Sequence, residues 1–354
     1  MTTLHDILIR QIATTGPITL ADYMTQCLLH PEHGYYTTRD PLGSAGDFTT
    51  APEISQMFGE LIGLCLAQTW LDQGAPGAFT LAEIGPGRGT LMADILRATR
   101  AVPGFHAAAT LHLIEASPTL RKAQADRLTD HTPTWHDSIT TLPEAPLLLV
   151  ANEFFDALPI RQFTRDAKGW RETMVAVQDT TLIAGLSDPA PIEMLDHRLA
   201  DTETGQIVET CAPAAPITAE ISRRIATYGG TALIFDYGDW HSRGDTFQAL
   251  RNHHPVDPFA TPGAADLTAH VDFEALALAA TGVTHSAMTT QGVFLERLGI
   301  TARAQTLATS LTGTALESHI QAHRRLTHPQ EMGSLFKTLA LVPTGAPLPP
   351  GYNQ

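Results

Sequence analysis

Cysteine is scarce in this sequence of 354 residues, which contains only Cys27, Cys65 and Cys211. The count is odd, the three lie far apart and no Cys-x-x-Cys spacing occurs, so neither a disulfide framework nor a structural zinc site is expected. No apolar run reaches the ~18 residues that a membrane span needs, and the first ten residues lack the apolar core of a signal peptide. We therefore expect a cytoplasmic protein with reduced thiols and no membrane-spanning segment.

Charged side chains are also few, at 17% of the residues, and acidic ones dominate. The formal net charge is −15. A surface this acidic repels phosphate groups, so we expect no nucleic-acid partner; a basic protein segment or a neutral small molecule fits better. With 43% hydrophobic residues, the chain can form a sizeable core as one large domain or two fused ones.

Patterns typical of strands and helices alternate from residue 79 onward. The predicted elements are strand 79–84, helix 90–100, strand 110–114, a helix from Ser117, strand 147–151, helix 217–228 and strand 231–237. Strands that alternate with helices of this length form a parallel sheet covered by helices on both faces. The sequence therefore predicts an α/β fold of the Rossmann-like kind.

Other regions flank or interrupt this alternating pattern. Before it lie amphipathic helices, and within it lie a segment typical of antiparallel strands and a long loop rich in proline, glycine and histidine. The predicted domains are an N-terminal helical extension with a lid at 1–75, a main domain at 76–342 with an inserted antiparallel and helical subdomain at about 160–212 and a long loop at 238–265, and a flexible tail at 343–354.

The strongest helix pattern in the N-terminal extension covers residues 51–72. Its apolar residues recur every three or four positions, and Thr50 followed by Glu53 fits a capping box at its start. Such a stripe packs equally well inside one chain or between two, so the sequence leaves open whether the protein forms a homodimer.

A glycine-rich loop after the first predicted strand carries the strongest functional signal. It reads Glu-Ile-Gly-Pro-Gly-Arg-Gly at positions 83–89. Dinucleotide loops use Gly-x-Gly-x-x-Gly to seat a pyrophosphate, whereas the spacing here, with an acid before the first glycine, suits S-adenosylmethionine. The acid can receive the cofactor's amino group, and the glycine backbone can lie along its methionine part. The predicted cofactor-binding residues of this loop are Glu83, Gly85, Pro86, Gly87 and Gly89.

Acidic residues after the next two strands favour an adenosyl ligand. Glu115 ends the second strand, where a carboxylate can accept both ribose hydroxyls. Asp137 follows the third short strand, where adenine usually lies. A glycine turn with surface acids is the alternative interpretation. Together with the loop, these acids predict an S-adenosylmethionine-dependent methyltransferase (EC 2.1.1.-).

A second polar loop, Asn-Glu-Phe-Phe-Asp-Ala-Leu-Pro at positions 152–159, follows the fourth strand. Ligands of open α/β sheets bind beyond the carboxyl ends of the strands, so this loop should face the transferable methyl group. Asn152, Glu153 and Asp156 are therefore the candidate catalytic residues. The alternative is a helix start, with Asn152 as N-cap and the acids favouring the helix dipole.

These blocks together resemble the MidA/NDUFAF-type (DUF185) family of methyltransferase-like proteins. The resemblance runs from about residue 5 to 342 and also uses segments 46–53, 266–273 and 291–295. It implies a seven-stranded class I methyltransferase sheet with extra helices. It further implies symmetric dimethylation of a protein arginine, on a respiratory complex I subunit in mitochondrial members, and so a role in complex I assembly.

The family match also favours a lid formed by segment 46–50. In this interpretation Asp47, Phe48 and Thr49 touch the cofactor, and an ordinary loop is the alternative. Glu53 is expected to act as a capping-box residue.

Arginine chemistry explains why two acids are expected near the methyl group. A guanidinium is always protonated near neutral pH. Carboxylates that form bidentate hydrogen bonds can hold it planar and leave the attacking nitrogen electron-rich. Glu153 and Asp156 are the candidate pair.

The sequence is also compatible with competing functions. They are a methyltransferase acting on a small molecule, a non-catalytic assembly or binding factor that retains the fold, and, least favoured by the glycine spacing, a nicotinamide dehydrogenase. Asp266, His270 and Asp272 suggest a metal site, but Asp272 fits a helix cap and no second histidine has ligand spacing, so no metal is expected.

Overall fold

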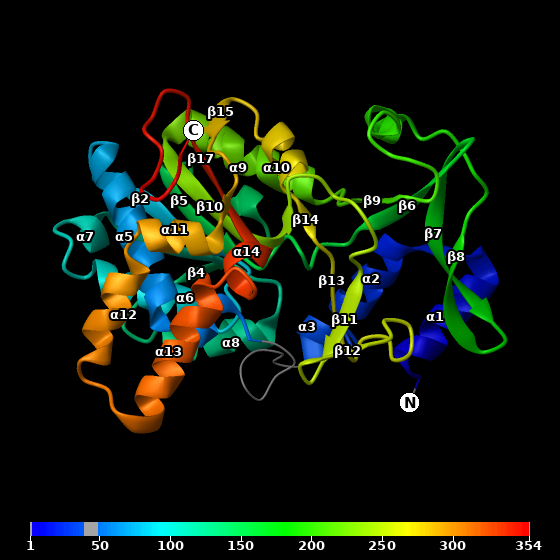
Figure 1. Ribbon diagram of the computed structural model, residues 1–354, viewed down its shortest axis with the longest axis horizontal. Coiled ribbons are helices and arrows are strands. Elements are labelled where there is room, and N and C mark those ends of the chain that lie inside the picture. Colours follow the sequence, from blue (N-terminus) through cyan, green and yellow to red (C-terminus); the bar gives the residue numbers. More distant parts are fainter. Residues whose placement is uncertain (1, 39–48, 354) are drawn as a thin grey trace. The chain divides into compact units, whose positions relative to one another are not determined.

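The computed structural model describes residues 2–38 and 49–353, which divide into two compact units (Figure 1). Asp47 and Phe48 of the expected lid lie outside the described residues. The larger unit comprises Thr49–Phe155, Pro216–Trp240 and Phe273–Gln354, and the smaller one comprises Met1–Phe48, Asp156–Ala215 and His241–Asp272.

A mixed sheet forms the centre of the larger unit. Its order in space is β4 (Thr134–His136), β3 (Ala109–Ile114), β2 (Phe79–Ile84), β5 (Leu147–Asn152), β10 (Gly230–Asp239), β17 (Phe336–Pro343) and β15 (Val283–His285). The pairings from β4 to β10 are parallel, and β17 runs antiparallel to both of its neighbours. The short β16 (Thr289–Thr290) also pairs with β17. The α/β, Rossmann-like fold is thus confirmed, with the doubly wound order from β4 to β10.

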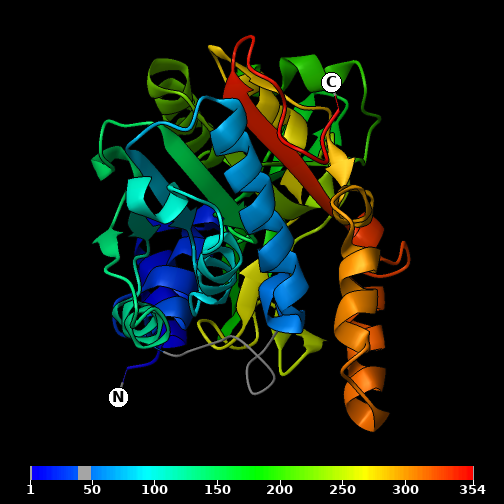
Figure 2. The same ribbon diagram turned by 90° about the vertical axis from the view of Figure 1, so that its left-hand side faces the viewer.

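The larger unit also contains helices. They are α4 (Ala51–Ile54), α5 (Gln56–Asp72), α6 (Thr90–Thr99), α7 (Phe105–Ala108), α8 (Pro118–Arg127), α9 (Ala214–Tyr228), α10 (Phe273–Ala279), α11 (Gln291–Arg297), α12 (Ile300–Ala308), α13 (Gly313–Thr327) and α14 (Met332–Leu335). Figure 2 shows α5 lying along one face of the sheet, while α12 and α13 run side by side as a hairpin. As expected, Ser117 caps α8, because its Oγ accepts a hydrogen bond from Leu120 N at 3.3 Å.

The single helix expected at 51–72 is broken at Ser55. Ser55 has an extended backbone, with φ −160°, and its Oγ accepts a hydrogen bond from Met57 N at the start of α5. The expected capping box is wrong: Thr50 precedes α4 without a side-chain cap bond. The Glu53 carboxylate instead accepts from the Thr90 hydroxyl. Glu53 therefore bonds to Thr90, which is distant in sequence, and not to the start of its own helix.

The smaller unit joins the N-terminal helices to the inserted strands. Its elements are α1 (Leu4–Thr15), β1 (Ile18–Thr19), α2 (Leu20–Leu29), α3 (Tyr35–Thr38), β6 (Arg161–Asp166), β7 (Gly169–Gln178), β8 (Thr181–Leu186) and β9 (Ile207–Thr210). The strands pair antiparallel, as expected. Leu8 and Tyr23 share one core with Ile160 and Val175. The N-terminal helices thus belong with the insertion, because that is where their apolar faces are buried.

Two further expectations about irregular segments differ from the structure. The long loop at 238–265 contains β11 (Gln248–Arg251) and β12 (His254–Val256), which form a three-stranded sheet with β13 (Asp266–Thr268). The end of the expected flexible tail is packed: the Tyr352 ring lies 4.8 Å from that of Phe294, and its hydroxyl bonds to Thr338. Within the described residues, no helix combines the length and hydropathy needed to cross a membrane.

Close packing of α5 on α6 depends on two glycines. A Cβ on Gly59 would lie 2.5 Å from Asp94 Cβ, and one on Gly63 would lie 2.9 Å from Ile95 Cα. Because α6 begins directly after the glycine loop, this contact also fixes the helix that follows the loop.

We therefore expect Gly63→Ala to destabilise the protein. The added methyl group meets backbone that cannot move aside, and overpacking of this kind costs ~1–3 kcal/mol. Urea denaturation measures the change in the free energy of unfolding. Gly77→Ala is the matched control, since no atom lies within 4 Å of its added Cβ; equal midpoints for the two variants would contradict the expectation.

Candidate functional site

The sheet register brings the two functional loops of the larger unit together. Ile84 of β2 pairs with Ile114 of β3 on one side and with Ala151 of β5 on the other. Asn152 pairs with Phe235 of β10. The glycine loop, Glu115 and the loop after β5 therefore begin at neighbouring carboxyl ends, where open α/β sheets bind ligands.

The glycine loop adopts backbone angles that require glycine. Gly85, Gly87 and Gly89 have φ values of 64°, 52° and 78°, a region that other residues rarely enter. A Cβ on Gly85 would lie 3.1 Å from Phe154 Cδ2. Pro86 is buried, and its carbonyl accepts from Gly89 N at 2.7 Å. The loop is thus a tight turn packed against the loop that follows β5.

Glu83 lies at the start of this turn and is 2% exposed. Burial raises the pKa of its carboxyl to about 8; a hydrogen bond from the Met92 backbone lowers it and the charge of Glu115 raises it further. Its Oε2 has no hydrogen-bond partner among the described residues. A buried carboxyl of this kind is stabilised in its ionised form when a cationic group binds beside it.

Glu115 is held in place by Gln124 of α8. The Glu115 carboxylate accepts from Ser117 N at 2.8 Å and from Gln124 Nε2 at 3.2 Å, while burial raises its pKa. Gln124 also donates to Gly87 O at 2.8 Å and accepts from Trp135 Nε1 at 2.7 Å. The sequence reasoning missed Gln124, although its spacing of four from Leu120 puts both on the buried face of one helix.

Asp137 and Thr49 lie at the edges of this arrangement. Asp137 follows β4, but its side chain is 88% exposed and pairs with Arg121. Arg121 Nε also donates to Glu115 O at 2.8 Å. Thr49 is half-buried just before α4.

The loop after β5 holds Glu153 in a strained conformation. Its φ is +51°, which is unusual for a residue with a Cβ. Its Oε1 accepts from Ala51 N at 3.1 Å and from Asn152 Nδ2 at 3.0 Å. Asn152 is 7% exposed, and its Oδ1 has no partner among the described residues. No helix follows Asn152, so its interpretation as an N-cap is wrong.

Asp236 of β10 fixes the backbone of this loop. Its Oδ2 accepts from Phe155 N at 2.9 Å and from Phe154 N at 3.2 Å, and its Oδ1 accepts from Tyr237 N at 3.0 Å. The side chain is fully buried. The sequence reasoning missed this residue as well, although an acid inside an apolar strand was a usable signal, since buried carboxylates need donors.

Asp156 belongs to the smaller unit, because the division falls after Phe155. It is 6% exposed, and its carbonyl accepts from Ala269 N at 3.0 Å.

Asp272, which was expected to cap a helix, directly precedes α10, and its side chain accepts a hydrogen bond from Ser242 N at 2.8 Å. In the part of the chain that the structure describes, no three His, Cys, Asp or Glu side chains are grouped to hold a metal ion.

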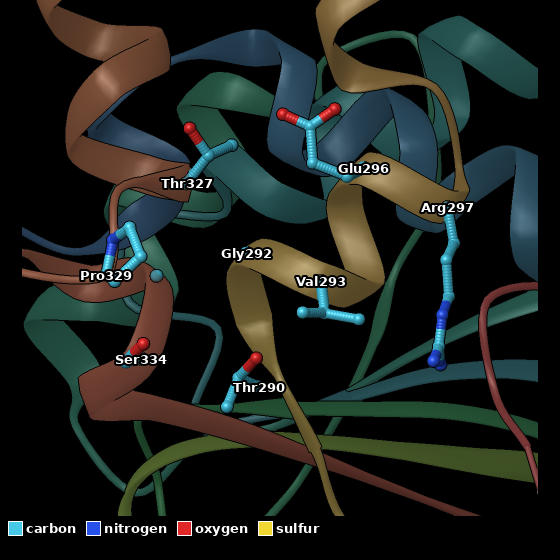
Figure 3. A pocket seen from close by; sticks show the side chains of 9 residues that line it. Thr290, Gly292, Val293, Glu296, Arg297, Thr327, Pro329 and Ser334 are labelled. Carbon is cyan, nitrogen blue, oxygen red and sulfur yellow. The ribbon is translucent and has the colours of Figure 1, made fainter.

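A separate hollow of about 430 Å³ opens in the larger unit beside α11, α13 and α14 (Figure 3). Thr290, Val293, Glu296, Arg297 and Ser334 are among its lining residues. None of the lining residues comes from the glycine loop or from the loop after β5, so the hollow is distinct from the strand ends.

Comparison with known proteins identifies the family of this chain. Residues 61–293 match the family of S-adenosyl-L-methionine-dependent methyltransferases. The chain belongs to this methyltransferase family. Its cofactor is S-adenosylmethionine, and the resemblance stated from the sequence is confirmed.

Curated relatives match this methyltransferase over nearly its whole length. It is 37% identical to the mitochondrial protein arginine methyltransferase NDUFAF7 of Danio rerio, with 94% of this chain and 85% of that protein covered. It is 36% identical to the Homo sapiens protein of the same name, with 95% and 82% covered.

A solved structure supports the fold and the cofactor. The chain is 28% identical to a superfamily member from Burkholderia thailandensis bound to S-adenosyl-homocysteine, with a TM-score of 0.84 and 98% and 93% of the two chains covered.

The cytoplasmic location expected from the sequence is contradicted by these relatives, which are mitochondrial proteins. The expectation used only the missing signal-peptide core and membrane span. Neither feature distinguishes one aqueous compartment from another.

The raised pKa of Glu83 makes the stability of the cofactor-free methyltransferase depend on pH. The native state keeps this proton up to a pH of about 8, whereas the unfolded chain releases it near 4.5. Between these values the native state binds more protons, so the free energy of unfolding falls as pH rises, by ~1.4 kcal/mol per unit from this group. Glu83→Gln should flatten that fall, measured by urea midpoints across the window; parallel curves for variant and wild type would refute it.

The three hydrogen bonds of Asp236 give a second expectation. Asp236→Asn keeps the shape but places an amide NH₂ against backbone donors, which should cost ~1–3 kcal/mol of stability. Because the loop would shift, the rate of methyl transfer should fall more than the affinity for S-adenosylhomocysteine. A turnover assay measures the rate, and calorimetry measures the affinity. Asp126→Asn, at an exposed position, is the control; unchanged turnover in Asp236→Asn would show that the loop does not need this anchor.

Proposed function

We propose that this methyltransferase is a protein arginine N-methyltransferase that forms symmetric dimethylarginine. The names of the curated relatives support an arginine in a protein as acceptor. The observation that carries the proposal is the fixed carboxylate of Glu153, which follows the strand beside the glycine loop and is held at a positive φ. From the family resemblance, the acceptor protein is a respiratory complex I subunit or a similar protein.

The cofactor site in this proposal is formed by residues at the carboxyl ends of β2, β3 and β4 and by the segment before α4. Glu83 would receive the amino group, which suits the unpartnered Oε2 of a buried carboxyl. Glu115 would accept the ribose hydroxyls. The remaining residues of the site are Gly85, Pro86, Gly87, Gly89, Asp137 and Thr49, and Asp47 and Phe48 join them as expectations outside the described residues.

The cofactor supplies an electrophilic methyl group on a sulfonium. The acids of the loop after β5 hold the protonated guanidinium planar and draw its positive charge toward one side. With the cofactor bound, the opposite nitrogen would be free to accept the methyl group, and a carboxylate of this loop would take up the proton that this nitrogen loses. Positioning in a site that excludes water provides most of the rate increase. Glu153, Asp156 and Asn152 are the residues assigned to these roles.

The charge of the protein is consistent with a basic acceptor segment. A net charge of −15 attracts an arginine-containing peptide and speeds its encounter with the enzyme. A small-molecule acceptor and a non-catalytic assembly role are the alternatives to be tested. The homodimer stays a prediction.

Glu153→Gln tests the proposal. The amide oxygen can still accept from Ala51 N, so the loop should keep its shape, but the negative charge that holds the guanidinium is gone. We expect transfer to fall by roughly 10²-fold or more, with affinity for S-adenosylhomocysteine largely kept. The measurement is incorporation of tritiated methyl from labelled cofactor into lysate protein, followed by hydrolysis and identification of the labelled amino acid.

Glu144→Gln is the matched control, because Glu144 is an exposed acid of the same unit. Full activity in Glu153→Gln would sink its assigned role. Label found only in small molecules would support the small-molecule alternative, and an absence of cofactor binding would support the assembly role.

A further inference from the structure

Two buried aspartates of the smaller unit act on a single tyrosine. The hydroxyl of Tyr36, in α3, donates to Asp266 Oδ1 at 2.7 Å. Burial raises the pKa of Tyr36 well above its usual value, and the charges of Asp266 and Asp156 raise it further. Asp156 is 6% exposed and Asp266 is 3% exposed. Tyr36 and Asp266 thus form a buried hydrogen-bonded pair in this unit, and the charge of Asp156 acts on the same phenol.

The backbone brings these residues together from three distant parts of the sequence. Asp266 begins β13, which pairs with β11, and Ala269 just after this strand donates to Asp156 O at 3.0 Å. Tyr36 comes from the N-terminal helices. The sequence suggested a metal site in the segment around Asp266, and Asp266 has no role in the proposed function.

Thr268 provides an independent sign that something binds here. Side chains two apart on a strand point to the same face, so the Thr268 hydroxyl lies on the Asp266 side of β13. Thr268 is 3% exposed, and its Oγ1 has no hydrogen-bond partner in the described part of the chain. Because a buried hydroxyl is rarely left unsatisfied, this atom marks a place where a ligand donor fits.

We propose that Asp156, Asp266 and Thr268 bind the guanidinium of the methyl acceptor, with Tyr36 as the positioning residue for Asp266. The proposal rests on the proposed function, since it names the residues of the smaller unit that hold the acceptor. A guanidinium presents five N–H donors in one plane and can satisfy two carboxylates and a hydroxyl at once. An ammonium has only three donors on a single atom, so the acceptor group is arginine rather than lysine.

This assignment changes the role of the pair Glu153 and Asp156. The two acids are three residues apart in one loop, but Asp156 shares its surroundings with Asp266 and Tyr36. In the proposal Asp266 therefore joins Asp156 in guanidinium binding. Glu153 keeps the role given to it at the end of β5.

Binding of a minimal acceptor tests the site directly. N-acetyl-arginine amide is titrated into the full-length protein with saturating S-adenosylhomocysteine and followed by NMR. N-acetyl-citrulline amide, the neutral isostere, and N-acetyl-lysine amide are the comparison compounds. We expect the arginine compound to bind at least roughly tenfold more tightly than either, because citrulline lacks the positive charge and lysine lacks the planar, bidentate set of donors.

Asp266→Asn and Thr268→Val should each weaken binding of the arginine compound, the first by roughly tenfold or more. Asp188→Asn is the control, since Asp188 is an exposed acid of the same unit. Affinity for S-adenosylhomocysteine and the melting temperature show whether each variant is folded. If Asp266→Asn does not fold, the near-isosteric Thr268→Val decides.

The possible failures are distinguishable. Wild-type affinity in both folded variants, or equal binding of the arginine and citrulline compounds, overturns this site and leaves arginine methylation standing. Recovery of the methyl label only on residues other than arginine rejects the proposed function instead, whatever the binding result.

Discussion

The Asp236 carboxylate is the interaction on which the arrangement of the larger unit depends. A fully buried charge needs donors, and Asp236 finds three of them in backbone N–H groups. Two of these belong to Phe154 and Phe155, so the loop after β5 cannot move independently of the sheet. The Phe154 ring in turn lies against Gly85, so close that an added Cβ would lie only 3.1 Å from its Cδ2. The cofactor loop and the loop carrying Glu153 are therefore fixed against each other.

Burial of acids recurs where ligands are expected to bind. Burial raises the pKa of Glu83 to about 8 and also raises the pKa of Glu115, so burial disfavours the ionised form of each carboxyl. A cationic ligand reverses that preference, and part of its binding free energy is spent on ionising the acid. The ligand-free protein is thus less stable than it could be, while its affinity for a cationic ligand is higher, and such a compromise is common at functional sites.

The smaller unit shows how an insertion can complete an N-terminal extension. Helices α1 and α2 bury their apolar faces in one core that also contains Val175 of β7 and Leu182 of β8. Sequence patterns find each segment but not this pairing, because two amphipathic surfaces match one another without any local signature.

The sequence by itself determined the features that depend on local backbone chemistry and period. These are the alternation of strands and helices, the glycine turn, the cap at Ser117 and the acid at the end of β3. Tertiary structure alone decided which partner each polar group takes: Glu53 bonds to Thr90 instead of its own helix start, and Asp266 faces Tyr36. Such choices depend on groups more than 30 residues away, and local spacing carries no information about which distant donor burial will bring within hydrogen-bond distance.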